Sequence, residues 1–141
     1  MDDDNRPMYL TKEAIENLND KLCLPDLGPF SQDWEYELAN SSRILEFITY
    51  YEQHDLSKDE KCALMALVIS CLDDYLSEGR APGEIWNKIR YYLLKENEIY
   101  INKIRYWSLE EEDLENCFSV TPLMREVIEQ MRENVKNDKI D

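Results

Sequence analysis

The sequence predicts an all-α protein, a single-domain bundle of five or six helices. Glycine is scarce, with 3 residues among 141, and the 5 prolines lie at positions 7, 25, 29, 82 and 122. The long stretches between these helix-breaking residues favour helices over a turn-rich β fold. Hydrophobic residues make up 43% of the chain, which is enough for one core at this length. We expect residues 1–10 to form a flexible acidic arm and residues 11–137 to form the helical domain.

The first helix is predicted from Thr11, a candidate N-cap, to about Leu22, and a loop follows over residues 25–29. The predicted inward face of this helix consists of Ile15, Leu18 and Leu22. A second helical segment begins at Ser31, another candidate N-cap, and ends near residue 51. Its predicted inward face consists of Trp34, Leu38, Leu45 and Ile48. The polar residues 40–42 interrupt the pattern, so this segment is either one helix or two.

The next helix is the clearest prediction and is expected to be central. Ser57 and Glu60 form a Ser-x-x-Glu capping box, in which each side chain satisfies the backbone amide of the other residue. The helix ends near Ser77, before Gly79, a residue type that terminates helices. Residues 62–72 are apolar nearly all round, so we expect neighbours on several sides. The residues expected to be almost fully buried are Leu67, Val68, Ile69 and Leu72. One narrow stripe is small or polar: Asp59, Ala63, Ala66, Ser70, Asp73 and Ser77.

Residues 82–107 allow more than one interpretation. Pro82 suits the first turn of a helix whose predicted inward face is Ile85, Ile89, Tyr92 and Leu93. The apolar pattern lapses at residues 96–98. A separate helix with Ile101, Ile104 and Trp107 inward is one interpretation. One long helix with residues 93, 96, 100, 104 and 107 on one face is the other, and a β-strand over residues 99–107 is a weaker alternative.

An acidic linker and a last helix complete the chain. The linker covers residues 110–115, and Thr121 and Pro122 then provide an N-cap and a first-turn proline. The predicted inward face of the last helix consists of Met124, Val127, Ile128, Met131 and Val135.

The formal net charge is −15, from 31 acidic and 16 basic residues, and it is distributed unevenly. Residues 1–80 carry a balance of −11, residues 81–107 one of +2 and residues 108–141 one of −6. So acidic a surface repels nucleic acid and anionic lipid and speeds the encounter with a basic protein. The middle stretch is expected to pack its rings inside and pair its bases with acidic helices, rather than to bind RNA. Its members are Lys88, Arg90, Tyr91, Tyr92, Lys95, Tyr100, Lys103, Arg105, Tyr106 and Trp107.

Catalytic and metal-binding chemistry has few candidate residues. The chain has one histidine, His54, which argues against a histidine-dependent triad, a two-histidine zinc site and a di-iron bundle. We expect His54 to be a cation at a helix C-terminus. The sequence has no glycine-rich phosphate loop and no EF-hand loop. It therefore predicts no enzyme activity, no cofactor and no metal site, with weak Ca²⁺ or Mg²⁺ binding at residues 110–115 as an alternative.

The start of the sequence and its cysteines indicate the compartment. Residues 1–4 lack the basic start and apolar run of a secretory signal. The longest apolar run, residues 62–71, is about half the length of a membrane span. The cysteines at positions 23, 62, 71 and 117 have neither a C-x-x-C pair nor metal-ligand spacing. We expect a cytoplasmic protein with reduced, mostly buried thiols.

Two acidic segments with aromatic neighbours are the candidate partner-binding sites. The first consists of Asp33, Trp34, Glu35, Tyr36 and Glu37. The second is the linker, with Glu110, Glu111, Glu112, Asp113 and Glu115. Aromatic residues dominate the energy of interfaces, and charges set the association rate, so both segments suit a basic protein partner. The alternative is structural: Trp34 lies in the core, and Trp107 and Phe118 hold the linker against it.

Several segments carry a resemblance to a known class of protein. They are the last segment from Tyr106 to Arg125, Glu60-Lys-Cys-Ala-Leu-Met65 and Trp86-x-x-Ile89. Together they resemble helical immunity proteins encoded beside bacterial polymorphic or contact-dependent growth inhibition toxins, over roughly residues 43–130. The resemblance implies tight, stoichiometric binding to a cognate toxin, frequently a nuclease, whose site acidic side chains occlude. It assigns no role to an individual residue.

The residues and the resemblance together lead us to expect an immunity or antitoxin-like inhibitor of a basic toxin. A non-enzymatic helical adaptor or regulatory subunit is the alternative, and an enzyme ranks third.

Overall fold

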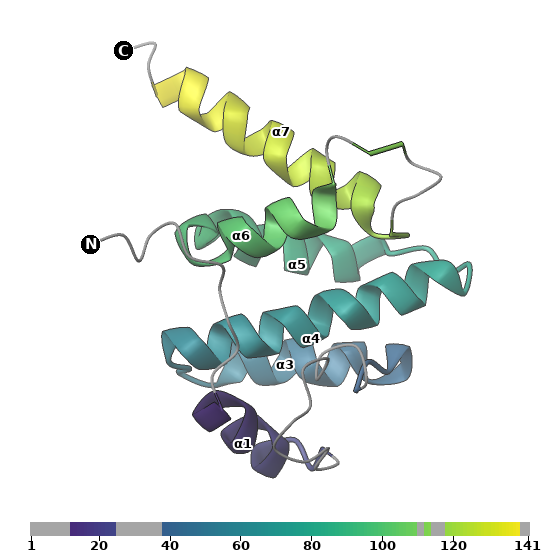
Figure 1. Ribbon diagram of the computed structural model, residues 1–141, viewed down its shortest axis with the longest axis vertical. Coiled ribbons are helices and arrows are strands. Elements are labelled where there is room, and N and C mark those ends of the chain that lie inside the picture. The colour runs from purple at the N-terminus through teal and green to yellow at the C-terminus, as the bar shows by residue number, and fades with distance from the viewer. Residues whose placement is uncertain (1–11, 25–37, 110–111, 114–117, 139–141) are drawn as a thin grey trace. The chain divides into compact units, whose positions relative to one another are not determined.

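The computed structural model describes residues 12–24, 38–109, 112–113 and 118–138 (Figure 1). Within these ranges it contains six α-helices, one short 3-10 helix and no strand, which confirms the all-α class. The chain divides into two compact units, residues 1–80 and residues 81–141. The expectation of one continuous helical domain over residues 11–137 stays a prediction.

The first unit is built around one long helix. Its elements are α1 (Lys12–Lys21), η2 (Ser41–Arg43), α3 (Ile44–Gln53) and α4 (Lys58–Ser77). Helix α4 packs against α1, η2 and α3, and α3 and α4 run side by side (Figure 1). Every α4 residue from 62 to 72 is buried. The prediction of a central helix is therefore confirmed for this unit.

The ends of α4 form as the sequence predicts. The Ser57 hydroxyl accepts a hydrogen bond from the Glu60 amide at 3.2 Å, and the Glu60 carboxylate accepts one from the Ser57 amide at 3.2 Å. At the other end Gly79 has a φ of +86°, the left-handed conformation that glycine adopts without strain. The middle of the stripe of small residues is not exposed to solvent, because Ala63, Ala66 and Ser70 are buried.

The buried faces of α1 and α3 differ in part from the predicted inward faces. On α1 the buried residues are Ala14 and Leu18, with Leu22 buried just after the helix, and Ile15 is half-buried. On α3 the buried residues are Ile44, Phe47, Ile48 and Tyr51. The prediction for Leu45 is wrong, because its position next to Ile44 turns it off this face and leaves it 56% exposed.

The polar residues 40–42 begin a helix rather than interrupt one. The Asn40 side chain accepts a hydrogen bond from the Ser42 amide at 3.0 Å, which caps η2. Residues 38–40 are not helical, so the interpretation as one helix from residue 31 to 51 is wrong. The predicted cap at Ser31, the predicted core position of Trp34 and the loop at residues 25–29 lie outside the described residues, as does Thr11.

Arg43 connects the two helices that cover α4. Its guanidinium donates to the Leu22 carbonyl at 2.8 Å and to both carboxylate oxygens of Glu46, at 2.8 and 2.6 Å. It also lies over the Phe47 ring, 4.8 Å from the ring centroid. The hydrogen bonds from Arg43 hold the pKa of the Glu46 carboxyl below its ordinary value. The end of α1 is thereby attached to the start of α3.

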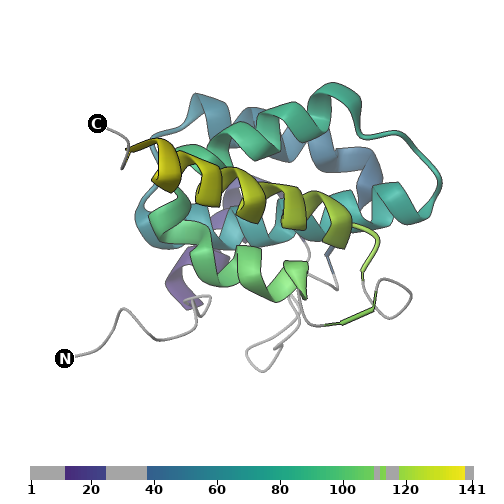
Figure 2. The ribbon, with the colours of Figure 1, turned by 90° about the horizontal axis from the view of Figure 1, so that it is seen from above.

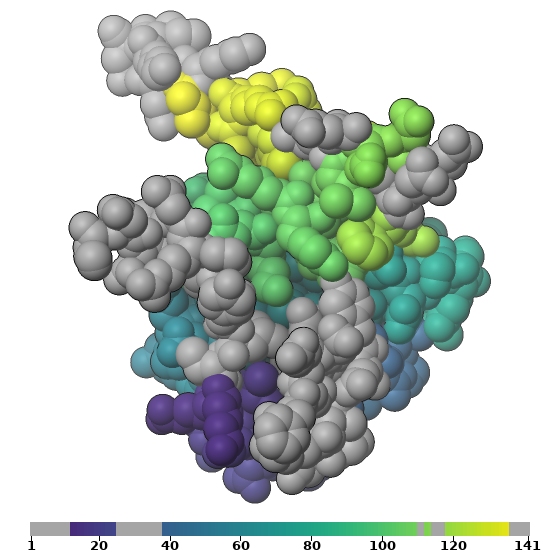
Figure 3. Space-filling model, in the orientation of Figure 1, coloured from purple at the N-terminus to yellow at the C-terminus, as the bar shows by residue number. Residues whose placement is uncertain are grey.

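The second unit is a three-helix assembly of α5 (Gly83–Lys95), α6 (Asn97–Ser108) and α7 (Thr121–Asp138). Each of these helices contacts the other two. Seen from above, α7 runs between α5 and α6 (Figure 2), and the side chains of α6 and α7 lie next to each other on one face (Figure 3). The buried apolar side chains of this unit are Trp86, Ile89, Leu93, Tyr100, Ile104, Trp107, Val120, Met124, Val127 and Ile128.

Residues 83–108 form two helices, so the single long helix and the strand are both wrong. Glu96 leaves the helical conformation at φ −120° and ψ 40°. The Asn97 side-chain amide donates to the Leu94 carbonyl at 2.9 Å, which satisfies one of the carbonyls left open at the end of α5. The lapse in the apolar pattern at residues 96–98 is the sequence signal of this break.

The inward faces of the second unit also differ in part from the prediction. Trp86 and Tyr100 are buried, whereas Tyr92 and Ile101 are half-buried. Burial along α7 decreases with distance from its start: Met124 and Val127 are fully buried, and Val135 is 52% exposed. The prediction for Val135 is wrong because the predicted inward residues of α7 are no longer buried after Ile128.

Candidate protein-binding surface

Most of the predicted site residues lie outside the described residues. This applies to Asp33, Trp34, Glu35, Tyr36, Glu37, Glu110, Glu111 and Glu115. Of the ten, the structure describes Glu112 and Asp113, and both are exposed. The contacts of these two residues therefore show how this part of the acidic linker is attached to the helices.

Arg125 of α7 holds the start of the linker. Its Nε donates to the Ser108 carbonyl at 2.8 Å, and its Nη2 donates to the carbonyls of Leu109 and Glu112, the latter at 2.8 Å. Carbonyls at a helix C-terminus lack partners within the helix and attract cations. Leu109 itself ends α6 in the left-handed conformation, at φ +40°. The guanidinium thus fixes the backbone of Glu112 against both α6 and α7.

Thr121 connects the end of α6 to Phe118, in the segment just before α7. Its buried hydroxyl donates to the Trp107 carbonyl at 2.7 Å and accepts from the Phe118 amide at 3.1 Å. The ring centroids of Trp107 and Phe118 lie 4.5 Å apart. The prediction that Thr121 is the N-cap of the last helix is wrong: Thr121 is its first residue, and its hydroxyl bonds to groups outside the helix.

Helix α7 adds a row of carboxylates that starts at Glu126, next to Arg125. Glu126, Glu129 and Glu133 are exposed and occupy neighbouring turns of one side of the helix. Glu129 forms an ion pair with Arg132 at 3.1 Å. We call the exposed acids Glu112, Asp113, Glu126, Glu129 and Glu133 the carboxylate surface. The sequence interpretation missed its α7 members, although they fall out of phase with the apolar face of the last helix.

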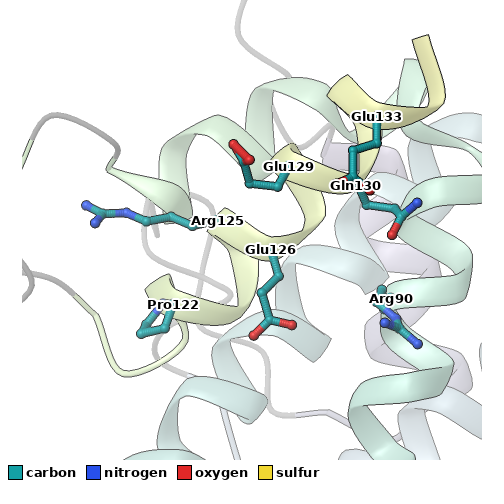
Figure 4. A pocket seen from close by; sticks show the side chains of 7 residues that line it. All are labelled: Arg90, Pro122, Arg125, Glu126, Glu129, Gln130 and Glu133. Carbon is teal, nitrogen blue, oxygen red and sulfur yellow. The ribbon is translucent and has the colours of Figure 1, made fainter. Parts of the chain in front are cut away.

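A groove of about 400 Å³ runs between α5 and α7 (Figure 4). The residues that line it are Arg90, Pro122, Arg125, Glu126, Glu129, Gln130 and Glu133. Arg90 comes from α5 and is half-buried, and the other residues follow one face of α7. The groove therefore has one basic wall and one mainly acidic wall.

The basic aromatic stretch is only partly internal. Tyr100 and Trp107 are buried, as expected, but Tyr91 is 55% exposed and Tyr106 48% exposed. On α5 the Lys95 ammonium lies over the Tyr91 ring, 5.6 Å from its centroid. The expectation that all of the rings pack inside is wrong for these two tyrosines.

The histidine and three of the four cysteines are among the described residues. His54 follows α3, where its Nδ1 donates to the Tyr50 carbonyl at 3.0 Å, and its ring stacks on Tyr50 at 3.8 Å. Cys62 and Cys71 are buried and form no disulfide, whereas Cys23 is exposed. Among the described residues, no group of three or more histidine, cysteine or acidic side chains is arranged to hold a metal ion.

Comparisons with known proteins and a test for membrane-spanning helices complete the description. None of the helices that the structure describes combines the length and apolarity that crossing a bilayer requires. Neither the models of known protein families, nor the curated proteins, nor the solved structures match the chain significantly.

Proposed function

We propose that the chain is a non-enzymatic protein-binding domain that neutralises a basic toxin domain, in the manner of an immunity protein. The observation that carries this proposal is the carboxylate surface on a fixed scaffold. Arg125 holds the backbone of Glu112 next to the end of α6, and α7 presents the exposed carboxylates of Glu126, Glu129 and Glu133. Exposed charges on rigid elements lose little entropy when they meet a basic site.

The charge of the whole chain supports the same kind of partner. A net charge of −15 attracts a basic protein over long range and disfavours nucleic acid, because phosphates carry the same sign. A toxin that binds nucleic acid has a positively charged site, which carboxylates of this surface could cover. The surface therefore suits an inhibitor that occupies a nuclease site by mimicking the charge of its substrate.

The test is coexpression with the protein encoded beside the gene of this chain. That protein is expressed in a bacterial host with and without the chain, and growth and complex formation are measured. We expect it to arrest growth alone and to be neutralised by a stoichiometric complex with the chain. A neighbouring product that neither arrests growth nor binds the chain would contradict the proposal, and binding without neutralisation would favour the adaptor alternative.

Two matched variants locate the contact surface. The first replaces four members of the carboxylate surface by their amides: Glu112→Gln, Asp113→Asn, Glu126→Gln and Glu133→Gln. The control makes the same change in net charge at exposed acids of the first unit: Glu13→Gln, Asp20→Asn, Glu52→Gln and Asp55→Asn. We expect the first variant to weaken the complex at least tenfold more than the control does, with both folded, because exposed charges contribute little to stability. Equal effects would show that the contacts lie elsewhere.

A further inference from the structure

We infer that the groove between α5 and α7 binds a helical segment of the protein partner that carries basic side chains opposite Glu126 and Glu133 and an acidic side chain opposite Arg90. This inference rests on the proposed protein-binding function and specifies the chemistry of the segment that docks. The groove is lined by seven side chains from two helices of the second unit (Figure 4).

The length of the groove matches that of a short helix laid along its open side. Its lining residues on α7 extend from Pro122 to Glu133, which corresponds to about 16 Å along the helix axis. That length matches about three turns of a second helix laid along α7. Helices that dock into apolar grooves use side chains spaced one and two turns apart. Charged side chains at the same spacing also lie on one face of a helix.

The charges in the groove are not all compensated within the chain. Glu129 is paired with Arg132, and Arg125 donates to three carbonyls of the α6 end and the linker. Arg90, Glu126 and Glu133, by contrast, form no ion pair within the part of the chain that the structure describes. Two carboxylates and one guanidinium are therefore available to a partner.

These three groups define the charge pattern of the docking segment. Glu126 and Glu133 are seven residues apart, so they lie two turns, or about 10.5 Å, from each other along α7. A partner helix meets both with lysine or arginine at positions i and i+7. A third basic residue between them would face Arg90 across the groove and be repelled, because like charges at short range disfavour binding. An acidic residue at i+3 or i+4 would instead pair with Arg90.

Three synthetic helical peptides of 18 residues test this pattern. All three peptides have lysine at positions i and i+7. They differ at position i+3, which is glutamate in the first, glutamine in the second and lysine in the third. Binding to the full chain is measured by fluorescence anisotropy at low ionic strength. We expect the glutamate peptide to bind more tightly than the lysine peptide, although it has the lower positive charge. Tightest binding by the lysine peptide would overturn the inference, because it would mean that net charge alone determines affinity.

Variants of the chain assign the preference to individual residues. Arg90→Glu should reverse the order, so that the lysine peptide binds best. Glu126→Gln and Glu133→Gln should each weaken binding of the glutamate peptide by about fivefold, the range of one partly exposed ion pair. Glu84→Gln, at an exposed acid of α5 that does not line the groove, is the matched control and should have little effect. An unchanged order in the Arg90 variant would overturn the assignment.

The outcome for the groove is distinguishable from the outcome for the proposed function. If the neighbouring gene product is neutralised but the three peptides bind indistinguishably or not at all, the groove is not the docking site and the function stands. If the peptides bind in the expected order but no neighbouring product is neutralised, the groove binds a basic helix of another kind of partner.

Discussion

The prediction at the residue scale concerns Leu72, at the end of the fully buried stretch of α4. Its side chain is completely buried, so Leu72→Ala removes buried methyl groups and leaves a cavity. We expect the free energy of unfolding to fall by about 2–5 kcal/mol. Urea unfolding of the variant measures this change, and Leu45→Ala is the control, because Leu45 is largely exposed and should lose little. A Leu72→Ala protein that melts within a degree or two of the parent would contradict the central position of α4.

The buried Cys71 thiol should make the free energy of unfolding depend on pH. Burial raises the pKa of this thiol from 9.0 to about 11, and the Asn40 amide donates to its sulfur at 3.3 Å. The thiol of the unfolded chain ionises first as the pH rises, so the contribution of Cys71 to stability is complete below pH 9 and is lost between pH 9 and 11. We expect the free energy of unfolding to decrease over this window by about 2 kcal/mol more in the parent than in Cys71→Ala. Parallel pH profiles for the two proteins would show that Cys71 does not ionise differently in the two states.

At the scale of single elements, features that depend on neighbouring residues were predicted correctly, whereas contacts between residues far apart in the sequence were not predicted. The capping box of Ser57 and Glu60 and the stop at Gly79 depend on residues within a few positions of each other, and both formed as predicted. The bonds of Thr121 to Trp107 and of Arg125 to Ser108 join residues 14 and 17 positions apart. No pattern of neighbouring residues encodes such pairs, because they depend on how α6 and α7 pack.

The same distinction explains which inward faces were wrong. Helical periodicity alone gives a face that continues along the whole helix, whereas burial follows the neighbouring helices. Val135 continues the apolar pattern of α7 but lies beyond its packed turns, and Tyr100 is buried although the two-helix interpretation did not place it inward. For the candidate site, the sequence analysis named the acidic linker but not the carboxylates of α7.

Thr121 gives the prediction at the scale of elements, because its hydroxyl joins α6 and Phe118 to the start of α7. Thr121→Val keeps the shape of the side chain but leaves the Trp107 carbonyl and the Phe118 amide without this partner. We expect a loss of about 1–3 kcal/mol in the free energy of unfolding, because buried polar groups without partners are costly. Hydrogen exchange of the Phe118 amide should accelerate in the same variant. Thr121→Ser retains the hydroxyl and should preserve that protection; if it exchanges as fast as Thr121→Val, the hydroxyl is not the connection.

At the scale of the whole molecule, charge and architecture change at the same point. The balance of −11 over residues 1–80 gives way to +2 over residues 81–107, and the boundary between the two compact units lies at residue 80. The sequence interpretation used this shift for electrostatics and used the hydrophobic content to predict one domain. The change in composition beside Gly79 and Pro82 is the sequence feature that coincides with this boundary.

The net charge leads to a prediction about association kinetics. Steering by long-range charge is screened over a Debye length of about 8–10 Å at physiological ionic strength, whereas direct contacts are screened less. We therefore expect the association rate with the proposed basic partner to fall steeply as salt rises from low to physiological concentration, measured by stopped-flow fluorescence. The two four-site variants should separate the contributions. Neutralising acids of the first unit should slow association and leave dissociation unchanged, whereas neutralising the carboxylate surface should also speed dissociation, because it removes contacts. An association rate that does not depend on salt would show that the net charge of −15 does not steer the partner.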